Sequence, residues 1–115
     1  VEIDVPQVEG ALLNLVLNAV DAAQEGGRIK LCAKLDEDVL CIDVENTGPR
    51  IPEENVAQIF EPFFTTKPFG TGLGLAIARG AARAHGGDLW LRSNQDGCVT
   101  FSMTLRTTPI RDLER

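Results

Sequence analysis

The feature that most constrains this chain is a long apolar run near its start that carries one polar stripe. Apolar character persists over residues 8–23, after a proline at position 6 that suits a helix start, and a glycine pair at 26–27 stops it. A helix that is apolar over most of its circumference is buried on most sides. At 100° per residue, four polar side chains fall within about 60° of one another on this helix: Asn14, Asn18, Asp21 and Glu25.

Two carboxamides one turn apart are unusual for a solvated helix face, where Lys, Glu and Gln are better helix formers. Asn14 and Asn18 therefore indicate oxygen ligands aimed at a specific partner. Mg²⁺ is the natural candidate, because it prefers oxygen ligands, retains several waters and binds through few protein groups together with substrate phosphates. A solvated face with incidental Asn residues is the alternative that this helix alone leaves open.

The rest of the pattern predicts an α+β layer structure rather than a strict strand–helix alternation. Four β-prone runs form two predicted hairpins, one around an acidic turn and one around an Asn-Gln-Asp-Gly turn: 29–35 with 39–45, and 88–93 with 99–106. Helices are predicted over 53–60 and 75–85, and a short edge strand over 1–4. One domain is expected over 1–106, followed by a polar tail over 107–115.

Composition excludes several functional classes. The 115 residues suffice for one domain, and no apolar run approaches the ~20 residues of a membrane helix. A net charge of −6 makes non-specific nucleic-acid binding improbable. The odd set Cys32, Cys41 and Cys98 contains no CxxC pair, which favours reduced thiols over a disulfide framework or zinc site. Because the chain begins with Val, it is expected to be a piece of a longer protein.

A second signal is the GTGLGL stretch at residues 70–75, which leads into the predicted second long helix. Glycines let backbone N–H groups approach an anion, and the N-terminus of a helix attracts phosphate. The stretch matches neither common phosphate fingerprint, since it lacks GxxxxGK[ST] and positions 75 and 77 break the GxGxxG spacing. A tight connection that packs a helix close to a sheet is the alternative.

Two loop segments lie between these signals. ENTGPRIP, residues 45–52, follows a strand, so a polar side chain there can point into a pocket, and an Asn can both donate to and accept from a purine edge. FEPFFTTK, residues 60–67, suits a hinged lid, with Lys67 as a point charge for phosphate. A plain turn at 46–52, and Phe residues that only cap the core beside a solvated Lys67, are the alternatives.

Taken together, these segments resemble the ATP-binding catalytic domain of sensor histidine kinases. That domain belongs to the GHKL superfamily, which includes DNA gyrase, the mismatch-repair ATPases and the ninety-kilodalton heat-shock chaperone. The resemblance covers residues 4–105. Four collinear boxes carry it: LLNLVLNAVDAA (12–23) is similar to the N box, ENTGPRIP (45–52) to the G1 box, FEPFFTTK (60–67) to the F box, and GTGLGLAIARGAARAHGG (70–87) to the G2 box.

The resemblance implies the Bergerat fold, an α+β two-layer sandwich whose mixed, mostly antiparallel sheet is covered on one face by helices. It implies ATP and Mg²⁺ as cofactors, with Asn18 as the Mg²⁺ ligand, Asn14 as the second catalytic residue and Thr100 beside the adenine. The nucleotide-binding set implied is Asn14, Asn18, Asp21, Asn46, Gly48, Ile51, Lys67, Thr71, Gly72, Leu73, Gly74, Leu75 and Thr100.

Two departures from the family pattern concern the G1 box. The family usually presents an Asp to the adenine amino group, whereas this chain has Asn46, which can accept the same hydrogen bond without charge assistance. Losing that assistance costs roughly 1 kcal/mol, a several-fold loss of affinity. Arg50 replaces the second G1 glycine, so it stiffens the loop, crowds the pocket or places a cation near the phosphates.

The resemblance implies a protein-histidine kinase fragment of a two-component signalling phosphorelay. It presents Mg-ATP to a histidine on a separate dimerisation domain, and His85 is not that phosphoacceptor. The fragment alone is expected to bind nucleotide without autophosphorylation. A degenerate nucleotide-binding or docking module of the same fold is the alternative. An anti-sigma-type protein kinase also stays open. An ATP-hydrolysing member is disfavoured, because Asn14 stands where those enzymes place a general-base Glu.

The partners implied are the histidine-bearing dimerisation domain of the parent chain and, through the parent kinase, a response regulator. No nucleic acid and no membrane contact by this domain are expected. The domain is expected in the cytoplasm, whether or not its parent is anchored in a membrane. A monomeric fragment is compatible with the resemblance, since dimerisation in the family resides in other helices.

Overall fold

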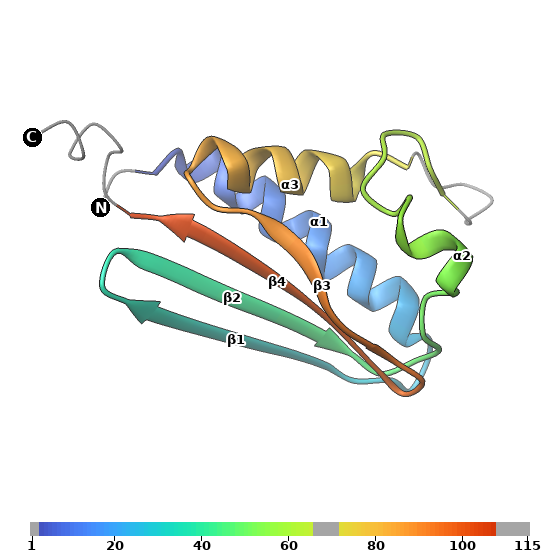
Figure 1. The fold of residues 1–115 in the computed structure, drawn as a ribbon. Helices are drawn as coiled ribbons and strands as arrows, with labels where there is room; N and C mark the ends of the chain where they lie inside the picture. Colours follow the sequence, from blue (N-terminus) through green and yellow to red (C-terminus); the bar gives the residue numbers. More distant parts are fainter. Residues whose placement is uncertain (1–2, 66–71, 108–115) are drawn as a thin grey trace, which may run out of the picture.

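The computed structural model describes residues 3–65 and 72–107, and its elements form two layers (Figure 1). In chain order they are α1 (Val5–Ala23), β1 (Ile29–Asp36), β2 (Val39–Asn46), α2 (Glu53–Val56), α3 (Gly74–Ala84), β3 (Leu89–Gln95) and β4 (Cys98–Arg106). The strands form one sheet in the order β1-β2-β4-β3, and α1 and α3 lie side by side over one face of it. This confirms the α+β two-layer sandwich. Every pairing between the described strands is antiparallel.

Helix α1 begins where its sequence provides a cap. The side chain of Asp4 accepts a hydrogen bond from the N–H of Gln7 at 3.1 Å, and a proline occupies the first turn. Residues 3–4 therefore precede the helix instead of forming the expected edge strand, and residues 1–2 lie outside the described part. One face of α1 is buried against the sheet and α3: Val8, Ala11, Leu15 and Ala19. The amide stripe lies on a different face of the helix.

The sheet separates an apolar inner face from a polar outer face by simple alternation. Along β4 the residues at 99, 101, 103 and 105 are buried and belong to the hydrophobic core. The residues between them point away from the helices. Among these, Ser102 donates to Asp43 Oδ1 at 2.6 Å, and Arg92 forms an ion pair with the same carboxylate at 2.8 Å. This alternation decides which side chains reach the helix side, where the cavity described below lies.

Three details differ from the sequence expectations or add to them. The helix expected over 53–60 ends at Val56, and turns follow in which the N–H groups of Gln58 and Glu61 bond carbonyls three residues back, at 2.9 Å each. Thr107, assigned to the tail, is buried and donates its N–H to Asp38 O at 2.8 Å. Among the described residues, no helix is long and apolar enough to span a membrane.

Candidate functional site

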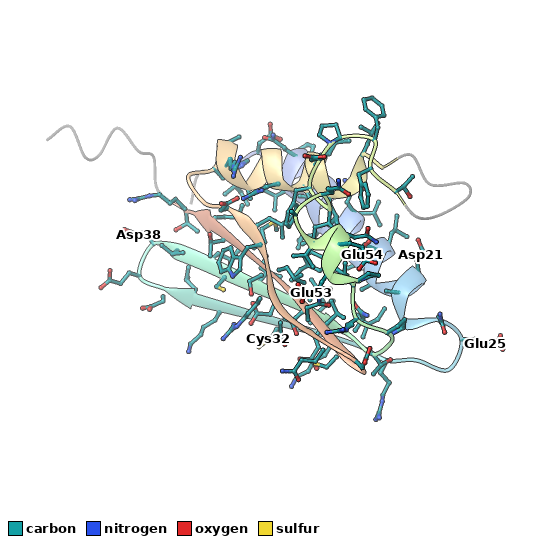
Figure 2. All side chains as sticks on the ribbon, turned by 45° about the vertical axis from the view of Figure 1, so that its right-hand side comes forward. Asp21, Glu25, Cys32, Asp38, Glu53 and Glu54 are labelled. Carbon is teal, nitrogen blue, oxygen red and sulfur yellow. The ribbon has the colours of Figure 1, made fainter. Side chains whose placement is uncertain are left out.

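A cavity of about 500 Å³ lies between α1, the start of α3, the sheet and the connecting loops. The loop 46–52 after β2 forms its first wall, and residues 59–65 together with 72–74 form its second wall. Its floor is β4, through Val99 and Phe101. Figure 2 shows Asp21 on α1 and Glu54 on α2 well away from the hairpin tip at Asp38. The cavity thus lies far from the β1–β2 turn.

The polar stripe of α1 lines this cavity. Asn14, Asn18 and Asp21 are all among its lining residues, and both asparagines are half-buried. Glu25, which shares the stripe in sequence, lies beyond the end of the helix and is exposed. Because the opposite side of α1 packs into the core, the helix holds its carboxamides in a fixed direction. Asn14 and Asn18 therefore face a cavity and not an open side of the helix, and their role as ligands stays a prediction.

The glycine loop meets the amide stripe at the same cavity. Gly72 and Gly74 both line it, as does Leu75, and a Cβ on Gly74 would lie 3.7 Å from Asn14 Oδ1. Leu73 sits between them as the N-cap of α3 and does not line the cavity. The first N–H groups of a helix have no partner within the helix, and here the helix begins at the cavity.

Gly72 is required by the way the two parts of the second wall approach each other. Its φ is +74°, and a Cβ there would lie 2.3 Å from the backbone carbon of Phe63. The contact is a hydrogen bond in which the N–H of Phe63 donates to Gly72 O at 2.8 Å. Two other expected site residues, Lys67 and Thr71, fall outside the described residues.

The first wall presents a buried amide to the cavity. Asn46 is 1% exposed and lines the cavity, and its Nδ2 donates to the carbonyl of Thr47 at 2.9 Å. That bond uses an N–H of the carboxamide, and Oδ1 is the acceptor atom of the same group. Ile51 and Arg50 also line the cavity. Gly48 does not: it lets the loop pass the end of α1, where a Cβ would lie 2.4 Å from Ala22 O.

Thr100 does not reach this cavity, so its expected place beside an adenine here is wrong. Val99 and Phe101 point to the helix side, and alternation turns Thr100 to the outer face of the sheet. There its hydroxyl lies 3.4 Å from Glu45 Oε1 and lines a separate hollow of about 370 Å³. Val99 occupies the position in the cavity that the sequence interpretation gave to Thr100.

The residues that hold the first wall were not found from the sequence. Asn94 on β3 accepts the N–H of Ile51 at 2.7 Å and donates to the carbonyl of Ile51 at 2.8 Å. Asp96, in the β3–β4 turn, accepts the N–H of Arg50 at 3.2 Å, and Gly97 donates to Gly48 O at 2.7 Å. The sequence showed Asn94 to Gly97 only as a turn signal, and nothing local indicates a partner more than 40 residues away.

The donor set suits a hydrated cation better than a closed metal cage. The described residues contain no group of three or more His, Cys, Asp or Glu that could hold a metal. The oxygen-bearing side chains on α1 at the cavity are two neutral amides and one carboxylate, Asp21. Mg²⁺ is commonly held by one or two protein oxygens plus ligand phosphates, so these residues fit Mg²⁺ accompanied by an anionic ligand.

Comparisons with known proteins agree with this geometry. Residues 3–109 match the sequence profile of the histidine kinase-, DNA gyrase B-, and HSP90-like ATPase family. The sensor protein FixL of Bradyrhizobium diazoefficiens is 36% identical over 102 residues, which are 86% of this chain and 20% of FixL. The chain spans 11% to 23% of the length of the eight curated relatives that we compared.

Solved structures show the same fold. The catalytic domain of the histidine kinase ThkA, in a nucleotide-free form, superposes with a TM-score of 0.85 at 43% identity, over 95% of this chain and 72% of that one. Full-length ShkA in complex with AMPPNP gives a TM-score of 0.75 at 31% identity, over 86% of this chain and 21% of that one. Since the family profile matches nearly the whole sequence, the chain belongs to the family of histidine kinase-, DNA gyrase B-, and HSP90-like ATPases.

Proposed function

We propose that this chain is the ATP-binding catalytic domain of a two-component sensor histidine kinase. The observation that carries the proposal is the convergence of Asn18 and the glycine loop at Gly72 and Gly74 on one cavity. The named relatives support it, because WalK of Bacillus subtilis and ZraS of Escherichia coli are sensor histidine kinases and the structurally similar ShkA was solved with an ATP analogue. The family membership supports ATP as the ligand.

The two walls suggest a division of roles around the nucleotide. The Oδ1 atom of Asn46 accepts a hydrogen bond from the adenine amino group, since its Nδ2 is already bonded to Thr47 O. Backbone N–H groups at 72–74 and the start of α3 bind phosphate oxygens. Lys67 and Thr71 belong to the proposed set as phosphate contacts, and Leu73 contributes through its backbone N–H alone. Gly48 and Thr100 now have no proposed ligand contact.

Asn18 is the proposed protein ligand of Mg²⁺, with Asn14 one turn before it toward the phosphates. When bound, Mg²⁺ neutralises charge on the phosphate oxygens. Phosphoryl transfer relies on positioning and charge neutralisation more than on covalent help from the protein. An imidazole nitrogen of the acceptor attacks the γ-phosphorus, the bond from that phosphorus to the β–γ bridging oxygen breaks, and ADP leaves.

The phosphoacceptor belongs to another domain of the parent chain in this proposal. His85 is the single histidine of the sequence, and both ring nitrogens are engaged in the fold. Its Nε2 accepts the N–H of Asp4 at 3.0 Å, and its Nδ1 lies 2.8 Å from Ala81 O. A ring held in this way at the far end of α3 is not presented to a nucleotide at the start of α3.

Titration calorimetry with a non-hydrolysable ATP analogue tests the binding half of the proposal. We expect binding that strengthens when Mg²⁺ is added, and Asn18→Ala should remove that strengthening. No heat at millimolar nucleotide would contradict the proposal. For transfer, the chain should not phosphorylate itself but should phosphorylate a cognate histidine-bearing helical domain added in trans. If nucleotide binds and no transfer follows, the degenerate docking module is the better description.

A further inference from the structure

Four side chains connect the end of α3 to the second wall of the cavity. Arg79 on α3 donates to Asp88 through Nε at 2.9 Å and through Nη2 at 3.5 Å. Its guanidinium carbon lies 4.7 Å from the centroid of the Phe60 ring. Phe60 in turn meets Phe101 edge to face, with centroids 6.1 Å apart and an interplanar angle of 89°. Of these four residues only Phe101 lines the cavity, as part of its floor.

Asp88 is itself held in place by backbone hydrogen bonds, so it fixes the position of the Arg79 guanidinium. It lies between α3 and β3, where its N–H donates to Thr104 Oγ1 at 3.1 Å and its carboxylate accepts the N–H of Leu89 at 2.8 Å. The guanidinium of Arg79 holds the pKa of the Asp88 carboxyl down, at about 2, with help from the Leu89 N–H and from Arg83. The carboxylate is therefore charged at neutral pH and fixes the guanidinium plane.

Phe60 is the point where the second wall is attached to the core. Its ring packs against the hydrophobic core, whereas Glu61, Pro62 and Phe63 after it are exposed. A guanidinium over the face of an aromatic ring is attractive, and an edge-to-face contact orients that ring further. Fixing Phe60 therefore determines where the exposed part of the wall begins.

We propose that Arg79 is a positioning residue of the nucleotide cavity, which holds Phe60 against Phe101 and thereby sets the second wall. This inference rests on the proposed function, because its main consequence is a change in nucleotide affinity. Arg79 does not line the cavity, so it acts through Phe60 and not by touching the ligand. The structure predicts that its stacking on the ring matters more than its charge.

Arg83 offers a matched control for this proposal. Its Nε bonds the same Asp88 oxygen at 3.1 Å, so Arg83→Ala removes an ion pair from the same carboxylate while Arg79 stays over the ring. We expect Arg79→Ala to raise the dissociation constant of a Mg-ATP analogue about three- to ten-fold. Arg83→Ala should change it less than about two-fold. Arg79→Lys keeps the charge but loses the planar face, and should recover only part of the affinity.

Two further readouts separate positioning from a general loss of stability. In a Phe60→Leu background, Arg79→Ala should cause no further loss of affinity, because the ring on which it acts is gone. Without any ligand, the amide proton of Phe63, bonded to Gly72 O, should exchange faster in Arg79→Ala than in Arg83→Ala. If Arg79→Ala fails to fold, Arg79→Gln, which keeps the stem of the side chain, replaces it.

The outcomes are distinguishable from a failure of the proposed function. If the wild-type chain binds no nucleotide, the proposed function fails, and the ligand-free exchange comparison alone decides the positioning role. If the wild-type chain binds and Arg79→Ala binds equally well, with unchanged exchange at Phe63, the inference is overturned. The inference is also overturned if Arg79→Ala and Arg83→Ala reduce nucleotide affinity equally, because the loss would then come from the ion pair that each residue forms with Asp88.

Discussion

The two walls of the cavity are built in different ways. The first wall, 46–52, is bonded to the β3–β4 hairpin through both backbone groups of Ile51 and through the N–H of Arg50, and its Asn46 is buried. The second wall is joined by a long-range backbone bond from Phe63 to Gly72 and by the packing of Phe60. Phe63 is 74% exposed, even though it makes that bond.

This difference suits a site that must both recognise and release a ligand. A wall bonded to the sheet keeps its hydrogen-bonding groups in place before a ligand arrives, which lowers the entropy lost on binding. A wall with an exposed segment at residues 61–63 opens there at low free-energy cost, because exposed side chains give up few buried contacts. On this view the first wall selects the base and the second wall controls access to the phosphates.

Replacing one glycine in each wall by alanine should separate effects on the free energy of unfolding from effects on nucleotide affinity. Gly48→Ala forces a Cβ against Ala22 O at a φ of +130°, beside the end of α1, and should lower the free energy of unfolding by about 3 kcal/mol. Gly72→Ala should lower it by only about 1 kcal/mol, because the exposed segment around Phe63 that the Cβ would meet can shift, but should weaken nucleotide binding about ten-fold or more. Urea unfolding and calorimetric titration measure the two effects.

Gly26→Ala controls for backbone strain in this pair. Its φ is +82°, yet a Cβ there meets nothing within 4 Å, so only the strain of about 1 kcal/mol should appear, without any change in affinity. If Gly72→Ala behaved like Gly26→Ala in both measurements, the second wall would have no role in binding.

Releasing the first wall from β3 should be the next largest effect. Asn94→Ala removes the donor and the acceptor that pair with Ile51, and should lower the free energy of unfolding by about 2 kcal/mol, with a several-fold loss of nucleotide affinity. Gln95→Ala, at the exposed neighbouring position, should stay within about 0.5 kcal/mol of wild type. Denaturation and titration that fail to distinguish the two variants would show that the first wall is not held by Asn94.

The smallest effect expected is the pH dependence of stability that comes from Asp88, the carboxylate that pairs with Arg79. The pKa of Asp88 is lowered from 3.8 to about 2 in the folded state, so its stabilising contribution is fully present above about pH 4 and is lost as pH falls toward 2. Because the Asp88 side chain is 40% exposed, we expect roughly 1 kcal/mol. Urea unfolding between pH 2 and 6 should show this loss in wild type, and the free energy of unfolding should depend less on pH in Asp88→Asn. If both proteins show the same pH dependence, the Asp88 carboxylate does not contribute.

The order of the elements was predictable from local sequence patterns, whereas the meeting of the amide stripe with the glycine loop was expected only from the resemblance to histidine kinase catalytic domains. Periodicity and turn residues determine where a helix or strand lies, and these are local properties. The correct side of β4 was also available, since Phe101 in the core places Val99 on its face and Thr100 on the other.

The supports of the two walls could not be predicted in the same way. The hydrogen bonds from Asn94 to Ile51 span 43 residues. The contact of the Arg79 guanidinium with the Phe60 ring depends on how α3 packs over the sheet. Such contacts follow from tertiary packing, in which an ordinary turn residue and an ordinary helix arginine acquire a specific partner. Single-sequence patterns contain no information about that pairing.

The difference between the two walls is measured most directly by amide hydrogen exchange at residues of both walls, with and without a Mg-ATP analogue. In the free chain, we expect slow exchange at Ile51, whose N–H is bonded to Asn94, and faster exchange at Phe63. On adding the nucleotide, Phe63 should slow markedly while Ile51 changes little. Equal exchange at the two amides in the free chain, or an unchanged rate at Phe63 with nucleotide bound, would contradict this expectation.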